Sequence, residues 1–206
     1  MLLNRFERRL VTGRLRDLVQ LRFDARRLHR LGGGVDGGRV LEIGCGKGVG
    51  LTAAFELFGA AEVDAFDLDP AMVGLARRRA TREGRFGGEG APRLRLWQGD
   101  AGDIPAAPAS YDAVFSYQVL HHLEDWRGAL DEVARVLRPG GRLYLAESLR
   151  AFVESPLWGR WMDHPAEDRF DLAELRAGLA AAGLMPQAER RMGRSLCWMV
   201  ARLEGA

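Results

Sequence analysis

A glutamate stands directly before a glycine-rich turn in the stretch LEIGCGKGVG, residues 41–50. Glycine-rich turns that follow an apolar strand usually hold phosphates on backbone amides. A carboxylate at Glu42 would repel a diphosphate, and inside a cleft that repulsion is poorly screened. Both common phosphate patterns are also incomplete, since Leu41 and Gly48 break G-x-x-x-x-G-K-[ST] and Val49 breaks G-x-G-x-x-G. The residues therefore favour a positively charged ligand at this turn.

Further residues able to bind or react follow later apolar runs. Asp67 comes 25 residues after Glu42, Asp100 follows RLRLWQG, and Glu147 ends RLYLAE. A fourth run, YDAVFSYQVLHHL, supplies Ser116, Tyr117, His121 and His122. Imidazole is the side chain whose charge changes near neutral pH, so the two histidines are the natural candidates for a general base.

The elements that position these residues alternate between strand and helix, which predicts an α/β fold with a mostly parallel sheet covered on both faces. Two consecutive strands at the C-terminus predict a closing antiparallel hairpin, and 148–170 reads as a long irregular link. Strands are expected at 39–44, 61–70, 93–100, 111–117, 142–147, 185–192 and 194–203. Helices are expected at 2–11, 14–31, 49–58, 70–83, 125–137 and 171–182, with Gly183 just past the end of the last one.

Composition is that of an ordinary globular chain, with 206 residues, 47% hydrophobic and 28% charged. No apolar run is long enough to cross a bilayer, and the arginine-studded N-terminus lacks the apolar core of a secretory signal. Two cysteines are too few for a disulfide framework, which favours a reducing cytoplasm. Residues 1–30 hold nine arginines against three acids, a net charge of +6, so the remainder carries −4.

Five ordered motifs resemble one family. They are VLEIGCGKG, AFDLDPAMVGLAR, LWQGDAGDIP, YDAVFSYQVLHHLEDW and EVARVLRPGGRLYLAE, which together cover roughly residues 38–147. In this order and spacing they resemble class I S-adenosylmethionine-dependent methyltransferases of the small-molecule type. The resemblance implies a Rossmann-like, seven-stranded, mostly parallel sheet with helices on both faces and an antiparallel C-terminal strand. It also implies S-adenosylmethionine as cofactor, whose sulfonium and ammonium groups explain the carboxylate of Glu42.

The resemblance implies a role for each motif residue that matches it. Asp67 would accept hydrogen bonds from both ribose hydroxyls, while Asp69 is better placed to cap the following helix. Leu68 would pack on the adenine, and Asp100 with the Ala101 amide would bind the adenine edge. The predicted cofactor-binding residues are Glu42, Gly44, Cys45, Gly46, Asp67, Leu68, Asp100, Ala101 and Ser116.

The methyl acceptor is less well defined by the sequence, and no metal site is expected. The segment SYQV lacks the [NDS]-P-P-Y motif of DNA amino-methyltransferases, and the residue sets of catechol-type, arsenite and protein arginine methyltransferases are also missing. The predicted catalytic residues are His121, His122 and Tyr117, with His121 preferred, since neighbouring residues of a helical turn point apart. A structural role for the histidines and core packing for Tyr117 remain open.

We expect an N-terminal helical cap over 1–37, a methyltransferase domain over 38–206 and a substrate lid within 148–170. The aromatic-rich segment 155–170 also fits a plain packed link. The basic N-terminal helices fit a cover over the cofactor first, peripheral contact with an anionic membrane second, and nucleic-acid binding last. Partners expected are a small-molecule methyl acceptor and no nucleic acid, with the oligomeric state undetermined.

Three other functions stay open. A lipid or quinone methyltransferase working at a membrane would use the basic helices. A non-catalytic S-adenosylmethionine-binding protein would keep the cofactor motifs without a base. A nicotinamide dehydrogenase would instead bind a dinucleotide, which Glu42 disfavours.

Overall fold

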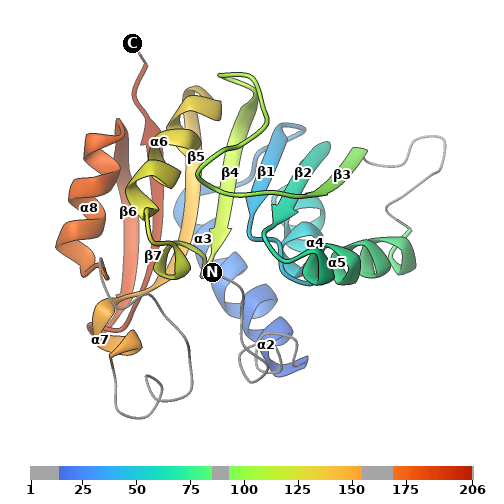
Figure 1. The fold of residues 1–206 in the computed structure, drawn as a ribbon, viewed down its shortest axis with the longest axis horizontal. Helices are drawn as coiled ribbons and strands as arrows, with labels where there is room; N and C mark the ends of the chain where they lie inside the picture. Colours follow the sequence, from blue (N-terminus) through green and yellow to red (C-terminus); the bar gives the residue numbers. More distant parts are fainter. Residues whose placement is uncertain (1–13, 85–92, 155–168, 206) are drawn as a thin grey trace.

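The computed structural model describes residues 14–84, 93–154 and 169–205. Seven strands form one sheet in the order β3-β2-β1-β4-β5-β7-β6 (Figure 1). Neighbours pair in parallel from β3 to β5, whereas β7 runs antiparallel to both β5 and β6. The strands are β1 (Arg39–Ile43), β2 (Glu62–Asp67), β3 (Arg93–Gln98), β4 (Tyr111–Tyr117), β5 (Leu137–Ser148), β6 (Leu184–Met192) and β7 (Leu196–Leu203).

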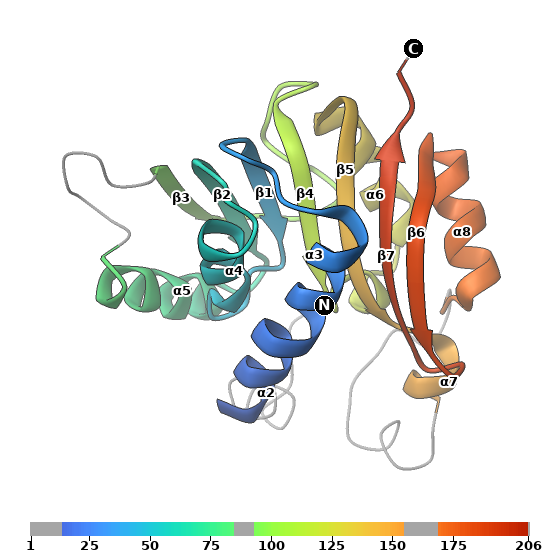
Figure 2. The same cartoon turned by 180° about the vertical axis from the view of Figure 1, so that it is seen from behind.

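Helices cover both faces of this sheet. Figure 1 shows α6 and α8 in front of it, and Figure 2, from behind, shows α3 and α4 on the opposite face. The helices are α2 (Arg14–Val19), α3 (Arg26–Gly32), α4 (Val49–Glu56), α5 (Pro70–Arg82), α6 (Trp126–Val136), α7 (Arg150–Val153) and α8 (Leu172–Ala181). A π-helical turn, η1 (Gln20–Ala25), joins α2 to α3, and a 3₁₀ turn, η2 (Leu120–His122), follows β4.

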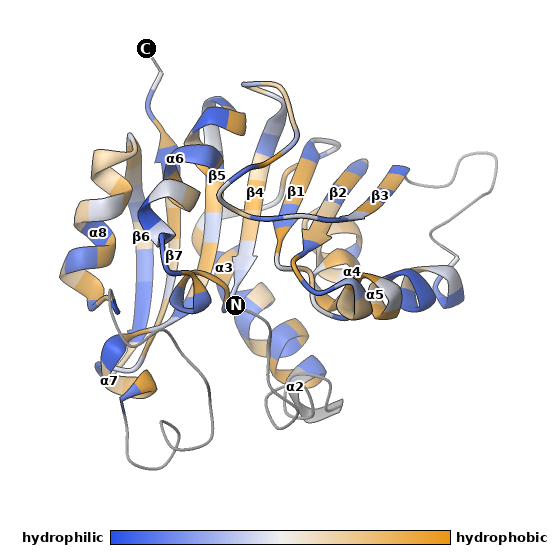
Figure 3. Cartoon of the chain, viewed as in Figure 1, coloured by the Kyte–Doolittle hydropathy of each residue, from blue (hydrophilic) through white to orange (hydrophobic). Residues whose placement is uncertain are grey.

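The core has two layers, one on each face of the sheet. Along β1, Leu41 and Ile43 pack on the face of α6 and α8, whereas Val40 packs on the face of α3 and α4. Because both faces are covered, the central strands β1 and β4 are buried along most of their length. The edge strand β3 instead alternates between exposed and partly buried residues. Figure 3 shows hydrophobic residues concentrated in β1, β2 and β5, with hydrophilic residues along β6 and on α5.

The chain order places a ligand crevice beside β1. Strand β1 lies between β2 and β4, so successive crossovers leave it in opposite directions. In open α/β sheets, ligands bind beyond the carboxyl ends of the strands where the order reverses in this way. The segments that follow β1 and β4, residues 44–48 and 118–122, therefore meet at one edge.

The fold class, the strand order at the C-terminus and the alternation of elements are confirmed. Two details differ. Strand β5 begins at Leu137 rather than 142, because Leu137 pairs with Tyr111 across a register shift and draws the Pro-Gly-Gly segment into the strand. A short helix, α7, lies where only irregular chain was expected. The helix expected at 2–11 lies outside the described residues, whereas residues 14–32 are helical throughout, as expected for 14–31.

Candidate functional site

The glycine-rich turn after β1 owes its shape to glycines in the left-handed region. Gly44, Gly46 and Gly48 have φ of 63°, 51° and 83°, a conformation that costs other residues about 1–2 kcal/mol. A Cβ on Gly44 would lie 2.5 Å from Cγ2 of Val119, whereas one on Gly46 would meet nothing within 4 Å. Gly44 therefore lets the turn pack on the segment after β4, and Gly46 leaves its outer side open to a ligand.

Glu42 is a deeply buried carboxylate near the end of β1. It is 1% exposed, and neither carboxylate oxygen has a hydrogen-bond partner within the part of the chain that the structure describes. A side chain on Gly50 would overlap the carboxylate, so this glycine makes room for it. Burial, and then the charge of Asp67, raise the pKa of Glu42 well above its ordinary value. Such a group stabilises a cation that enters beside it.

Tyr117 shares the buried region around Glu42. It is 6% exposed, and its hydroxyl also lacks a partner among the described residues. Burial, followed by the charges of Glu42 and Asp24, raises its pKa well above the ordinary value. Its ring packs parallel to Phe115, 6.1 Å away between centroids, so Tyr117 packs in the core and also presents a polar end beside Glu42.

Asp67 ties the end of β2 to the glycine-rich turn. One carboxylate oxygen accepts the amide of Gly46 at 2.8 Å and the other accepts the amide of Asp69 at 2.9 Å. Each oxygen keeps a further lone pair. Burial raises the pKa of Asp67 most, and the charge of Asp69 raises it further. Asp69 caps α5 through the amide of Ala71, with Pro70 at the first helical position, which confirms its predicted capping role.

The predicted adenine-binding residues lie around the same edge. Leu68 is 36% exposed, a high fraction for a leucine next to a core strand. Asp100 is exposed and accepts the amide of Gly102 at 2.9 Å, closing a tight turn, while Ala101 is 5% exposed. Asp100 thus stabilises its own turn through the Gly102 amide. Its role toward adenine stays a prediction.

Cys45 and Ser116 are buried more deeply than the ligand roles predicted for them suggest. The Cys45 thiol is buried, and burial raises its pKa well above the ordinary range, so it is an inert thiol. Ser116 is 0% exposed, and its hydroxyl lies 3.5 Å from Oε1 of Glu147. Their parts in cofactor binding stay predictions.

The two histidines follow β4 in η2. His121 is 9% exposed, and its Nδ1 lies 2.6 Å from Oε2 of Glu147. The His121 and His122 rings are 4.1 Å apart between centroids, so they do not point apart as the sequence suggested. Adjacent side chains leave a 3₁₀ turn about 120° apart, so the side-chain torsions, and not the backbone of η2, bring the two rings together. Glu147 is 0% exposed, so this strand-end carboxylate is fully buried and does not face solvent.

One group of ion pairs near the site was not predicted from the sequence. Asp17 of α2 lies 2.6 Å from Nζ of Lys47 in the glycine-rich turn and 3.1 Å from Arg79 of α5. Deeper in the same helical segment, Asp24 accepts the indole N–H of Trp198 at 2.9 Å. Asp17 and Asp24 stand out as acids in a basic segment, which is the one feature of the sequence that could have indicated these contacts. Their partners are 30 or more residues away along the chain, so the sequence does not identify them.

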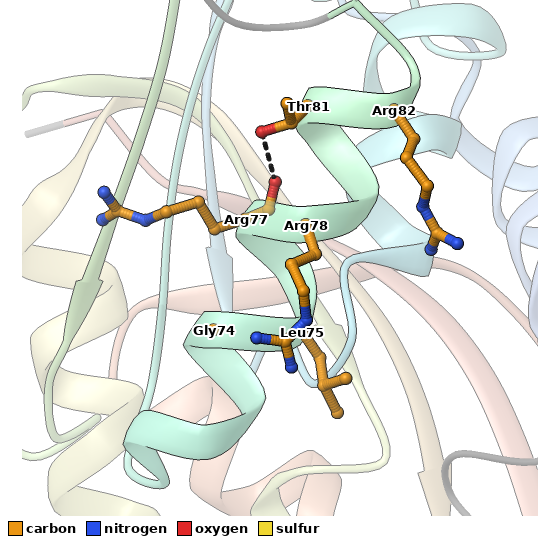
Figure 4. Close-up of a pocket in the computed structure, with 6 residues that line it drawn as sticks. All are labelled: Gly74, Leu75, Arg77, Arg78, Thr81 and Arg82. Carbon is orange, nitrogen blue, oxygen red and sulfur yellow. Dashed lines mark hydrogen bonds between the residues drawn. The ribbon is translucent and has the colours of Figure 1, made fainter.

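A shallow hollow on α5 is separate from this arrangement. Figure 4 shows it lined by Gly74, Leu75, Arg77, Arg78, Thr81 and Arg82, with the Thr81 hydroxyl bonded back to the Arg77 carbonyl. It contains none of the predicted site residues. Within the described ranges, no group of three or more His, Cys, Asp or Glu residues is placed to hold a metal ion.

The strand order, the glycine-rich turn at the reversal point and the acids that end β1 and β2 define the class I S-adenosylmethionine-dependent methyltransferase fold. Residues 41–145 match the family described as Methyltransferase domain, and the chain belongs to that family. The resemblance found in the sequence is thereby confirmed, and S-adenosylmethionine is the cofactor of this class.

Curated relatives and solved structures agree with this assignment. The chain is 36% identical over 126 residues to a fatty-acid O-methyltransferase of Mycolicibacterium smegmatis, covering 61% of this chain and 42% of that protein. It is 32% identical over 161 residues to a ubiquinone biosynthesis O-methyltransferase of Xylella fastidiosa, covering 73% and 62% respectively. The chain thus spans less than two thirds of the length of either relative.

Among solved structures, the methyltransferase in complex with the Haloferax volcanii Trm112 activator superposes with a TM-score of 0.77 at 22% identity, covering 97% of this chain and 95% of that one. An S-adenosylmethionine-dependent methyltransferase from Aquifex aeolicus gives 0.70 at 20% identity, covering 91% and 93%. At these identities the likeness establishes the fold.

Proposed function

We propose that this chain transfers the methyl group of S-adenosylmethionine to a small organic molecule, on oxygen, nitrogen or carbon. The observation that carries the proposal is Glu42, a buried carboxylate with no partner among the described residues, beside an open glycine-rich turn. A buried charge of this kind is costly unless it is neutralised, and a bound cation neutralises it. The cofactor supplies a methyl carbon already activated by a positive sulfur.

The residues at this edge fit the parts of the cofactor. Glu42 attracts the cationic end, and the turn at Gly46 admits the amino-acid portion without a side chain in the way. Asp67 keeps lone pairs for the ribose hydroxyls, and the exposed Leu68 offers an apolar surface to the adenine. The remaining proposed contacts come from Gly44, Cys45, Asp100, Ala101 and Ser116.

Names of the relatives support a small acceptor. The two matched here are O-methyltransferases of fatty acids and of ubiquinone biosynthesis. The acceptor proposed for this chain is an organic molecule of that general size, taken up from the cytoplasm. His121, His122 and Tyr117 are the proposed groups beside the reacting atoms.

Calorimetry followed by a transfer assay tests the proposal. The protein should bind S-adenosylmethionine and S-adenosylhomocysteine and ignore NAD and ATP. With a labelled methyl donor, a metabolite extract should then yield a labelled small product. Binding with no product from any extract would favour a non-catalytic cofactor-binding protein, and uptake of NAD alone would favour a dehydrogenase.

Asp67→Ala should weaken S-adenosylmethionine binding by about tenfold or more, because two hydrogen bonds to a charged acceptor are lost. Asp69→Ala should instead cost about 1 kcal/mol of folding free energy through the lost helix cap, with a smaller change in affinity. Calorimetry and urea unfolding of both variants measure the two effects. Equal losses of affinity would mean that the ribose acid has been assigned wrongly.

We also propose that residues 1–37 act as a cap over the cofactor edge and that 148–170 contributes a substrate lid. The cap is supported by Asp17, which joins α2 to Lys47 of the glycine-rich turn and to Arg79. Figures 1 and 2 show α2 extending past the edge where β1 and β4 end. Most of the lid, residues 155–168, lies outside the described residues.

Peripheral contact with an anionic membrane is a second proposal for the same helices. Leu18, Val19 and Phe23 are 48%, 40% and 45% exposed, and the exposed Arg22 and Arg26 lie on either side of Phe23 in sequence. This is the pattern of a helix that lies in a membrane interface. No helix in the described ranges is long and apolar enough to cross a membrane.

Liposome flotation measures this contact. The protein should float with vesicles rich in phosphatidylglycerol at low salt, since basic residues near an anionic surface each add about 1 kcal/mol. Phe23→Ser together with Arg22→Ser should reduce flotation several-fold, whereas the exposed Arg202→Ser at the far end of β7 should not. Equal recovery from neutral and anionic vesicles would contradict the preference for an anionic surface, and no recovery from either would contradict the membrane contact.

A further inference from the structure

The segment between β4 and η2 is held in a strained conformation by strand β5. Gln118 has φ of 63° although it is not glycine, and such strain persists only where surrounding contacts enforce it, often at functional sites. Its amide donates to the carbonyl of Ala146 at 2.7 Å. Its side-chain oxygen accepts the hydroxyl of Ser148 at 2.5 Å. Residues on either side of Glu147 therefore fix the point where the chain turns toward the histidines.

Glu147 itself holds the rest of this turn. Its Oε1 accepts the amides of Val119 at 2.8 Å and Leu120 at 2.9 Å. Its Oε2 is 2.6 Å from Nδ1 of His121. One fully buried carboxylate thus sets both the backbone of the turn and the orientation of the imidazole that the turn carries.

The charged and titratable neighbours of this pair are few among the described residues. His122 lies beside His121 in η2, and its charge lowers the pKa of Glu147. Cys197 lies opposite Glu147 in the register of β5 and β7, and burial together with the Glu147 charge raises the pKa of its thiol to about 12. Burial is the largest influence on Glu147 and raises its pKa to about 7.

We propose that Glu147 is a positioning residue that holds His121 with N–H on Nδ1, so that Nε2 takes a proton from a hydroxyl on the methyl acceptor. The proposal rests on the methyltransferase function proposed above and narrows the acceptor to molecules with an ionisable O–H, such as phenols. The acceptor oxygen bonds to the methyl carbon, the carbon–sulfur bond breaks to leave S-adenosylhomocysteine, and the hydroxyl proton moves to Nε2. Charge and atoms balance without a metal or a redox partner.

Tautomer control is what the Glu147 carboxylate adds. In neutral imidazole one nitrogen carries the proton and the other accepts, and the partner of the first nitrogen decides which is which. A carboxylate is only an acceptor, so the nitrogen facing it must donate. An amide at the same place can present its NH₂ group to Nδ1, which reverses the tautomer and leaves Nε2 protonated.

Glu147→Gln is therefore the decisive variant. The amide oxygen can still accept the Val119 and Leu120 amides, so the turn should keep its shape while the His121 tautomer reverses. We expect kcat toward a panel of phenols to fall about 100-fold, with S-adenosylmethionine affinity unchanged within about twofold. Glu147→Asp should recover part of the loss, and Glu204→Gln, near the C-terminus, should have no effect.

Two-bond ¹⁵N–¹H correlation spectra of ¹⁵N-histidine protein at pH 8 report the tautomer without any acceptor. The His121→Ala variant identifies which signal belongs to His121, and its kcat should fall by about the same factor as that of Glu147→Gln. The double variant should lose little further kcat, because the two residues act as a unit. An unchanged tautomer in Glu147→Gln, or full turnover in either variant, would overturn the proposal. So would methylation confined to acceptors without a hydroxyl.

These outcomes distinguish a failure of the proposed methyltransferase function from a failure of the positioning role of Glu147. Protein that binds no S-adenosylmethionine would contradict the proposed function. Protein that binds it and methylates phenols at wild-type rates after Glu147→Gln would contradict only the positioning role.

Discussion

Glu42→Gln should make the ligand-free protein more stable at pH 8 while weakening S-adenosylmethionine binding by about 100-fold. Removing one partner of a buried charge pair costs about 2–5 kcal/mol, and about 2.7 kcal/mol corresponds to that factor. In the ligand-free protein the same carboxylate has no partner among the described residues. In the ligand-free protein, replacing the charged carboxylate by a neutral amide therefore removes the cost of burying a charge and breaks no contact among the described residues.

The stability effect has a defined pH dependence. Burial raises the pKa of Glu42 in the folded protein above its ordinary value of 4.5, so folding takes up a proton. The contribution of Glu42 to the free energy of unfolding is therefore fully present below about pH 4.5 and is lost as pH rises through the folded pKa. Glu147, whose pKa is about 7, contributes in the same direction. The advantage of Glu42→Gln over wild type should grow between pH 5 and pH 8.

Urea unfolding at both pH values and calorimetry at pH 8 measure the two effects. Glu204→Gln, an exposed glutamate on the same chain, is the matched control and should change neither quantity. Unchanged affinity in Glu42→Gln would show that the cofactor does not use this carboxylate. A variant that is less stable than wild type at pH 8 would show that Glu42 has a stabilising partner in the folded protein.

Gly46→Ala and Gly44→Ala should separate ligand binding from folding within one turn. Both glycines have positive φ, so each alanine costs about 1 kcal/mol or somewhat more. Nothing lies within 4 Å of a Cβ on Gly46, so this variant should fold and lose S-adenosylmethionine affinity by about 30-fold or more. The added methyl group would occupy the open side of the turn proposed for the amino-acid portion.

Gly44→Ala should lose stability as well. Its Cβ would lie 2.5 Å from Val119, and overpacking of this kind adds about 1–3 kcal/mol to the backbone cost. Val119 cannot move freely, because its amide donates to Glu147. Turnover should therefore fall together with the unfolding free energy.

Circular dichroism melts and calorimetry of the two variants provide the comparison. Gly183 has φ of 75° and lies beyond the end of α8, far from the glycine-rich turn. The Gly183→Ala variant therefore controls for the cost of left-handed backbone strain alone. Wild-type affinity in Gly46→Ala would place the cofactor elsewhere. Equal stability of Gly44→Ala and Gly46→Ala would mean that the contact with Val119 yields at little cost.

Local chemistry let the sequence determine the fold and much of the proposed cofactor edge. Alternating apolar strands and helices fix a covered parallel sheet, and Asp69-Pro70 is a helix start whose geometry depends only on adjacent residues. A carboxylate and a glycine-rich turn lie within five residues of each other at Glu42, Gly44 and Gly46. The sequence alone therefore indicated a positively charged ligand. The full extent of β5 was missed, because pairing of Leu137 with Tyr111 is a contact between distant segments.

Only the tertiary structure decided what each buried polar group faces. Glu42 and Glu147 both end strands in the sequence, yet Glu42 lacks a partner among the described residues, whereas Glu147 accepts two backbone amides and contacts His121 in the turn after β4. Asp17 joins Lys47 and Arg79, which lie 30 and 62 residues further along the chain. Such pairings arise because the sheet brings strand ends from distant parts of the chain to one edge, where desolvation makes every unmatched charge costly. Local sequence patterns do not indicate which of these distant groups the fold brings together.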